Sequence, residues 1–320
     1  MDALQILLPP WPEDEFISRS WHLFMSVAAL WSINNLRNLL KVKPASSDPK
    51  TMCCAIFTLV CAFRSFVPRV DAERLCFWDL GIISTPFIGR SCATVAEIAF
   101  AYQFTRYWQR IVSAADLPGS MQIANLGWFL CSFAQGLCWT GVLTTNNFWH
   151  ACENSLWGIS PFILSIGAFF ALAKGGKKEK LHSEANLKFL RCFCVIGPAF
   201  VLYLAVNDVP MYIEKWKQGI GGGVDLHPID GLWDSMTCKV SRADNVWDIE
   251  YIWMTGYFIG GVWISQQLEY MDEFMVGAKK VKKVKKVKKV KKVKEATKAV
   301  RSRSKSRSRT ARSMSRSKKD

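Results

Sequence analysis

Long runs of apolar residues, separated by short polar segments, dominate the first 270 positions of the chain. A run of roughly 18 or more apolar residues forms a helix long enough to cross the ~30 Å hydrocarbon layer of a bilayer. We place seven such runs at residues 21–40, 51–67, 77–105, 121–143, 149–173, 189–212 and 247–269. The pattern predicts an all-α, polytopic membrane protein, a seven-transmembrane-helix bundle formed by residues 1–275, rather than a soluble enzyme.

The net charge of the chain, +16, comes from its C-terminal end. Residues 279–320 hold 21 Lys and Arg against two acids, which leaves 21 basic and 24 acidic residues, a charge of −3, for the preceding 278 positions. The motif Lys-Lys-Val repeats every three residues, a step about 60° short of a helical turn, so its valines spiral around a helix and form no apolar face. Residues 276–320 are therefore predicted to be a disordered basic tail.

A basic tail beside a membrane is attracted to anionic lipid head groups. We expect such contacts from Lys279, Lys280, Lys282 and Lys283, at the start of the repeat. An acidic cytoplasmic protein is the alternative partner of the tail, and a nucleic acid is a less favoured one. The lipid bilayer itself is the expected partner of residues 1–275.

Basic residues also predict the orientation of the spans, because Lys and Arg concentrate in cytoplasmic loops. The loops after the first, third and fifth predicted spans are basic, the last of them being Lys174–Lys180. These loops and the tail fall on one side if the number of spans is odd. The N-terminus is then outside or lumenal and the C-terminus cytoplasmic. The loop between the second and third spans opposes this pattern, because it places Arg64, Arg69 and Arg74 on the outer side.

Three charged residues lie within the third predicted span. Asp79, Arg90 and Glu97 are separated by 11 and 7 residues, and such spacings return to within about 20° of the same direction on a helix. Each charge costs about 2.5–3.5 kcal/mol at the bilayer centre, so we expect this stripe to face the bundle. Arg90 and Glu97 are about 10 Å apart along the helix axis, which disfavours a direct pair. Each is expected to meet a partner on another helix.

Partners for the stripe come from the start of the fifth predicted span. His150, Glu153 and Asn154 share one helical face by their spacings of three and four residues. We expect an ion pair between Arg90 and Glu153, with His150 close to Asp79 or to Glu153. These six residues form the predicted polar site, and the pattern leaves open whether they only fasten helices or also bind a solute.

Most of the eleven cysteines lie inside apolar runs, where they pack as small hydrophobes. Cys76 and Cys238 fall on predicted outer segments, where an oxidising compartment permits a disulfide, and Cys152 competes for this pairing. No Cys-x-x-Cys pair occurs, and the spacing of His150 and Glu153 supplies only two metal ligands. Neither a metal site nor a cofactor is predicted.

Ionisable residues inside membrane spans are typical of solute and ion pathways. The favoured function is a transporter or channel for a small polar or ionic solute. A seven-helix ligand-sensing receptor that uses the same residues is the first alternative, and a membrane-embedded enzyme is the second. No hydrolase or metalloprotease motif occurs, so enzymatic activity is not predicted. The pattern indicates an integral, multi-pass protein of either the plasma membrane or an endomembrane.

Overall fold

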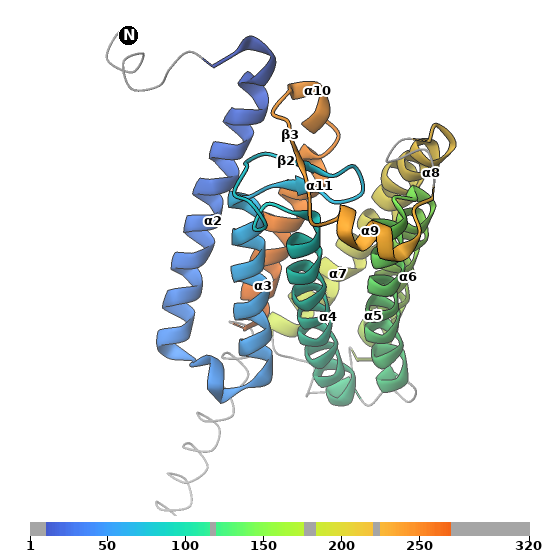
Figure 1. The fold of residues 1–320 in the computed structure, drawn as a ribbon. Coiled ribbons are helices and arrows are strands. Elements are labelled where there is room, and N and C mark those ends of the chain that lie inside the picture. Colours follow the sequence, from blue (N-terminus) through green and yellow to red (C-terminus); the bar gives the residue numbers. More distant parts are fainter. Residues whose placement is uncertain (1–10, 116–119, 176–183, 220–224, 270–320) are drawn as a thin grey trace, which may run out of the picture. The chain divides into compact units, whose positions relative to one another are not determined.

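A computed structural model describes residues 11–115, 120–175, 184–219 and 225–269. They belong to one compact unit, Met1–Tyr270, in which long helices run alongside each other and a small sheet lies at one end (Figure 1). The predicted basic tail, residues 276–320, lies outside the described residues, as do its four lysines with predicted lipid contacts.

The long helices coincide with the apolar runs of the sequence. They are α2 (Phe16–Val42), α3 (Pro49–Phe66), α4 (Pro86–Ala115), α5 (Ser120–Thr144), α6 (Asn147–Gly175) and α7 (Glu184–Tyr203). A π-helical turn, η3 (Leu204–Asp208), joins α7 to α8 (Val209–Lys217). The last apolar run forms α11 (Tyr251–Thr255), a second π-helical segment, η4 (Gly256–Gly261), and a helical stretch at residues 262–269.

Short elements cap the two ends of these helices. They are η1 (Glu13–Glu15), η2 (Ala45–Ser47), α9 (Pro228–Asp234), α10 (Asp244–Trp247) and the strands β1 (Arg69–Val70), β2 (Leu75–Cys76) and β3 (Lys239–Val240).

Four of the described helical segments are long and apolar enough to cross a membrane: Pro49–Phe66, Gln122–Thr144, Asn147–Ala173 and Leu187–Lys217. Large apolar side chains on these segments point away from the protein, for example Phe129, Phe169 and Val195, which are 60%, 64% and 70% exposed. Such a surface suits lipid rather than water. The architecture is that of a multi-pass, all-α membrane protein, while the number of seven spans and their orientation stay predictions.

The main apolar core joins α2, α3, α4 and the last helical run. Met25, Phe57, Phe77, Trp247 and Met254 are fully buried in it. The first long helix and the last helical run therefore pack together against the central helices. This packing places the last helical run beside the helix that carries Arg90 and Glu97.

A tight turn between α5 and α6 makes these two helices antiparallel neighbours. Thr145 adopts a left-handed conformation with φ of 57°, and the side-chain oxygen of Asn146 accepts a hydrogen bond of 2.9 Å from the backbone N–H of Phe148, in the first turn of α6. Because the turn is short, residues shortly before it on α5 face residues shortly after it on α6. This places Cys138 opposite His150.

The third predicted span begins nine residues too early, because α4 starts at Pro86 rather than at Phe77. Asp79 lies in the preceding loop, where its carboxylate accepts a hydrogen bond of 3.2 Å from the backbone N–H of Gly81. Gly81 has a φ of 61°, which breaks a right-handed helix, and proline is favoured at the first helical position. The predicted stripe is therefore wrong at its first member, since Asp79 is exposed and outside the helix.

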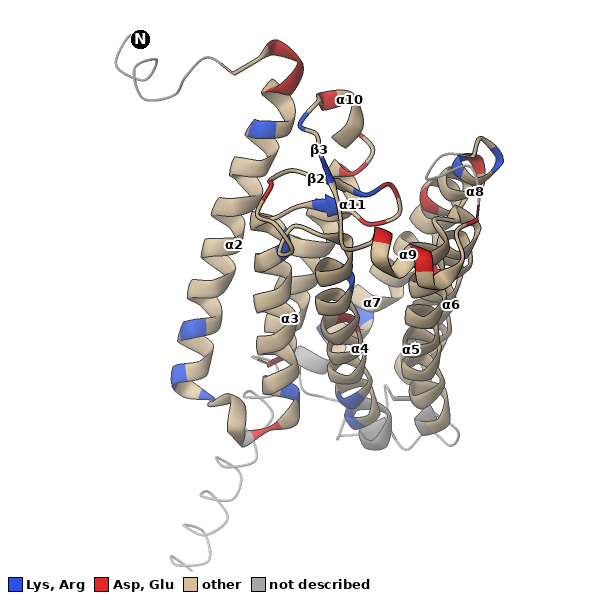
Figure 2. Cartoon of the chain, viewed as in Figure 1, with Lys and Arg blue, Asp and Glu red and all other residues tan. Residues whose placement is uncertain are grey.

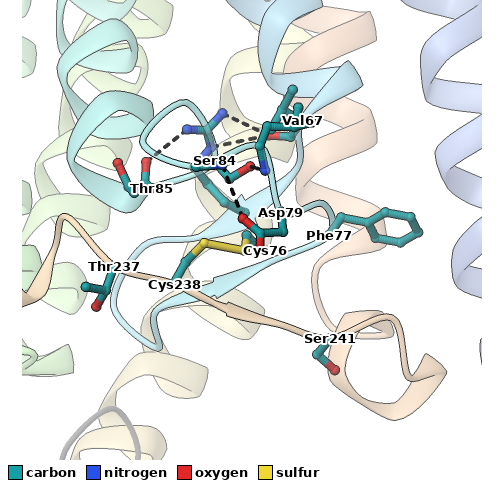
Figure 3. Close-up of a disulfide and its surroundings, with 12 residues drawn as sticks. Val67, Cys76, Phe77, Asp79, Ser84, Thr85, Thr237, Cys238 and Ser241 are labelled. Atoms are coloured by element: carbon teal, nitrogen blue, oxygen red, sulfur yellow. Dashed lines mark hydrogen bonds between the residues drawn. A yellow bond between two sulfur atoms is a disulfide. The ribbon is translucent and has the colours of Figure 1, made fainter.

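A disulfide between Cys76 and Cys238 fastens the three-stranded sheet (Figure 3). Strand β2 pairs antiparallel with β1 and parallel with β3, in the register Cys76 to Val240. The disulfide joins cysteines 162 residues apart in the sequence, and their Cα atoms are 5.9 Å apart. Cys152, the competing partner, is a free thiol in the structure.

The three arginines that opposed the predicted charge pattern are held in contacts near this sheet. Arg64 forms an ion pair of 3.6 Å with Asp71, and Arg74 one of 2.7 Å with Asp234. Arg69 is 1% exposed and donates to backbone carbonyls between the end of α3 and the start of α4. Its burial lowers the pKa of the guanidinium to about 10, which leaves it charged at neutral pH. These contacts give all three arginines a structural role near the sheet.

The two ends of the unit differ in charge. Figure 2 shows Lys and Arg at the end of α2, the start of α3 and the end of α4, which we call the basic end. At the other end, near the sheet, acidic residues lie on α9 and α10, while both acidic and basic residues lie on α8 and basic residues lie on the strands; we call it the disulfide end. Two of the three predicted basic loops thus lie together, and the side chains of Lys174–Lys180 are outside those described.

Candidate functional site

A group of buried polar side chains lies between α4, α5 and α6. We call it the polar centre, and it consists of Arg90, Glu97, Gln135, Cys138, His150 and Glu153, each 8% exposed or less. Its organising residue is Arg90 on α4. One guanidinium nitrogen, Nη2, donates to Gln135 Oε1 at 2.9 Å and the other, Nη1, to Cys138 Sγ at 2.9 Å. Arg90 thereby joins α4 to α5.

Arg90 also pairs with Glu97 on its own helix, which contradicts the expectation that they are too far apart. Arg90 Nη2 lies 2.8 Å from Glu97 Oε2. The predicted separation of about 10 Å counted only the rise along the helix axis and left out the length of the two side chains. Helical side chains lean toward the N-terminus, so that of Glu97 extends back toward Arg90, and the long arginine side chain covers the remaining distance. The contact is an ion pair without hydrogen-bond alignment.

The acid and the histidine of α6 form the other half of the polar centre. His150 Nδ1 lies 3.0 Å from Glu153 Oε2 and 3.8 Å from Cys138 Sγ. The imidazole rests against Gly141 on α5, where a Cβ atom would come within 2.9 Å of His150 Nε2. The absence of a side chain at position 141 therefore lets the ring lie between the two helices.

The structure assembles four of the six residues of the predicted site. Arg90, Glu97, His150 and Glu153 belong to the polar centre, and His150 lies next to Glu153, one of the two predicted neighbours. The preferred ion pair between Arg90 and Glu153 is not formed within 4 Å, since Glu97 and the α5 residues take the guanidinium.

Two residues of the predicted site lie outside the polar centre. Asn154 donates its amide to the backbone carbonyl of His150, one turn back on the same helix. Asp79 is exposed in the loop before α4.

Several buried polar atoms of the centre have no hydrogen-bond partner among the described residues. They are Arg90 Nε, Gln135 Nε2, His150 Nε2 and Glu97 Oε2, the last of which still forms the ion pair with Arg90. The hydroxyl of Tyr257, on η4, is also unpartnered, and this residue lies close enough to Glu97 to interact with it electrostatically. Buried polar groups are almost always paired in folded proteins, so a cluster of unpaired ones calls for an explanation.

Sequence reasoning missed the α5 residues of the polar centre. Gln135 and Cys138 are single polar or soft positions inside an apolar run, and each looks ordinary alone. Their spacing of three residues places them on one helical face, which was the available signal. The sequence does not say that α5 packs against α4, so the contacts of these two residues with Arg90 could not be predicted.

A second buried polar cluster near the basic end was also missed. Glu269, 1% exposed, pairs with Lys43 and accepts hydrogen bonds of 2.8 Å from Thr51 and 3.1 Å from Gln103. Gln103 is bonded in turn to Ser265, at 2.5 Å. Each carboxylate oxygen of Glu269 has a partner, so this cluster is a fastening between helices.

The side chains of the polar centre can supply metal ligands as well as charges. A sulfur atom of Cys138, a ring nitrogen of His150 and a carboxylate oxygen of Glu153 all lie within 4.8 Å of one another. The thiolate, imidazole and carboxylate are ligands for divalent transition metals. The sequence provided two of these ligands, and the helix pairing provides the third.

No protein family, curated protein or solved structure matches the chain. The inference of a function therefore rests on the geometry of the polar centre.

Proposed function

We propose that the protein is a transporter or channel that passes a small ionic solute, with the polar centre as its binding site. The observation that carries this proposal is the set of unpartnered polar atoms around Arg90 and His150 in the interior of a helical membrane protein. Ionisable residues in such a position are costly, and they commonly mark pathways for ions and solutes.

A network that only fastens helices should be closed, as the cluster around Glu269 is. Half-satisfied buried networks cost stability, because the local dielectric constant is low and each unpaired group has lost its water. The polar centre leaves polar atoms without a hydrogen-bond partner on four side chains, those of Arg90, Glu97, Gln135 and His150. Arg90 Nε and Gln135 Nε2 are donors, and the oxygen of a water molecule that hydrates a bound solute would accept hydrogen bonds from them.

The charges of the polar centre favour a cation as the solute. In this centre the single guanidinium of Arg90 stands against two carboxylates, those of Glu97 and Glu153. Acidic residues lie on α9 and α10 at the disulfide end (Figure 2). Their field would raise the local concentration of cations there.

Flux into vesicles tests the proposal. The purified chain would be reconstituted into liposomes, and uptake of monovalent and divalent cations measured under imposed gradients. Arg90→Gln and Glu97→Gln should abolish uptake, while Asp79→Asn, which changes an acid outside the polar centre, should leave it intact. If correctly folded variants transport like the unchanged chain, or if that chain shows no flux under any gradient, the proposal fails.

A ligand-sensing receptor is the second candidate, and a groove at the disulfide end favours it. The groove has a volume of about 570 Å³ and is lined by Asp208, Glu214 and Asp248 together with apolar side chains. It suits a small organic cation with an apolar part. Thermal stabilisation by such cations that is lost in Asp248→Asn and retained in Arg90→Gln would support a receptor. The absence of any stabilisation would remove this support.

For the basic tail, residues 276–320, we propose attachment to anionic lipid. Binding of a peptide of this sequence to vesicles containing phosphatidylserine should weaken steeply as salt is raised, since exposed charges are screened. Salt-independent binding would contradict the electrostatic basis.

A further inference from the structure

We infer that Cys138, His150 and Glu153 form a binding site for a divalent transition-metal ion of intermediate softness, for which Zn²⁺ is the natural probe. The site occupies the α5–α6 side of the polar centre. It does not require that the metal be transported, so it can be tested by equilibrium binding independently of flux.

The distances between the three ligand groups are close to those of a tetrahedral zinc site. Bond lengths of about 2.3 Å to sulfur and 2.0–2.1 Å to nitrogen or oxygen give a tetrahedral S···N separation of about 3.6 Å and an N···O separation of about 3.3 Å. The observed separations are 3.8 Å from Cys138 Sγ to His150 Nδ1 and 3.0 Å from His150 Nδ1 to Glu153 Oε2. The third separation, from Cys138 Sγ to a carboxylate oxygen of Glu153, is within 4.8 Å, so side-chain shifts of up to about 1 Å would complete the geometry.

The charges around the site accommodate a divalent ion. A thiolate at Cys138 and the carboxylates of Glu97 and Glu153 carry three negative charges, which Arg90 and a divalent ion together balance. Coordination forms the metal–sulfur bond and releases the thiol proton of Cys138 to bulk water. The guanidinium donates to Cys138 Sγ at 2.9 Å, and a metal-bound thiolate accepts such hydrogen bonds.

Three protein ligands leave the fourth tetrahedral position for water or a solute group. Closed zinc sites that serve folding have four protein ligands, whereas three ligands are typical of sites at which the metal reacts or exchanges. His150 Nε2, which faces Gly141, also lacks the hydrogen-bond acceptor that usually strengthens a histidine ligand. Both features favour an exchangeable ion over a permanently held one.

Zinc binding to the purified full-length chain in detergent tests the inference. The unchanged protein should bind Zn²⁺ at this site, and Cys138→Ser, His150→Gln and Glu153→Gln should each weaken binding by at least about 10- to 100-fold, the loss that changes to outer partners of metal ligands already cause. Two matched controls should bind normally: Cys131→Ser, a buried thiol on the same helix, and His22→Gln, a half-buried histidine on α2.

X-ray absorption of the zinc-loaded, unsubstituted protein keeps the test independent of how well the variants fold. One sulfur at about 2.3 Å and nitrogen or oxygen ligands at about 2.0–2.1 Å are expected. A spectrum without sulfur, or equal loss of binding in the Cys131→Ser control, would overturn the site. Zinc binding without any cation flux would support the metal site and contradict transport. Cation flux without zinc binding would support transport and contradict the metal site.

Discussion

The ion pair between Arg90 and Glu97 makes a quantitative prediction about stability. Both residues are nearly buried, at 5% and 6% exposure, and their charged atoms are 2.8 Å apart. At that distance and an effective dielectric constant of about 20, the Coulomb attraction is about 6 kcal/mol, part of which is offset by the cost of removing both ions from water. Glu97→Gln leaves the guanidinium with only neutral acceptors on α5, and should cost about 3–5 kcal/mol.

A double-mutant cycle separates the pair from the rest of the polar centre. Arg90→Gln combined with Glu97→Gln should be less damaging than the sum of the single changes, with a coupling energy of about 2–3 kcal/mol. Unfolding in mixed micelles, followed by tryptophan fluorescence, provides the measurement. The pair between Arg19 and Glu15 is the control, because its side chains are 23% and 21% exposed and its coupling should stay below about 1 kcal/mol. Additive single effects at Arg90 and Glu97 would refute the reasoning.

Three further changes test particular contacts. Cys76→Ser should lower the free energy of unfolding by up to about 5 kcal/mol for a closed loop of this length, and reducing agent should not lower the unfolding midpoint of this variant further. Gly231→Ala should destabilise by at least about 1–3 kcal/mol, because the new Cβ would lie 1.5 Å from the backbone oxygen of Leu143; a normal unfolding midpoint would contradict this packing. Gly141→Ala should displace the imidazole of the polar centre and weaken zinc binding, whereas Gly136→Ala, with no atom within 4 Å of its Cβ, should leave it unchanged. Equal zinc affinity in these two variants would count against the close approach.

The apolar runs predicted where most long helices lie, because burial in lipid requires the same residue types over a fixed length. They located the start of α4 poorly, since Phe77 and Leu80 are apolar yet belong to the loop that packs against the sheet. The local signals for the true boundary were Gly81 and Pro86, and a hydropathy window averages over both. Hydropathy therefore indicates the presence of a helix better than its first residue.

The sequence predicted the residues of the polar centre on α4 and α6. It did not predict which of these residues contact one another or α5. Charges such as Arg90 stand out in an apolar run, and helical spacing brought His150 and Glu153 together. The contacts with Gln135 and Cys138 depend on how α5 packs, which no pattern within a single helix contains. The pairing of Cys76 with Cys238 was accessible because both were expected on the same side of the membrane.

The disulfide also constrains the path of the chain across a bilayer. Cys76 and Cys238 must be on the same side to be joined, so the chain between them crosses an even number of times, whatever the count elsewhere. Three of the four candidate spans, on α5, α6 and the joined pair α7–α8, lie between these cysteines, so if all three cross, the disulfide requires that α4 cross as well. Cys238 is synthesised only after these helices, so the bond can close only once they have been threaded correctly. If one of these helices failed to insert, the two thiols would lie on opposite sides of the membrane and could not be joined. Formation of the disulfide would therefore indicate that the helices have inserted with the correct topology.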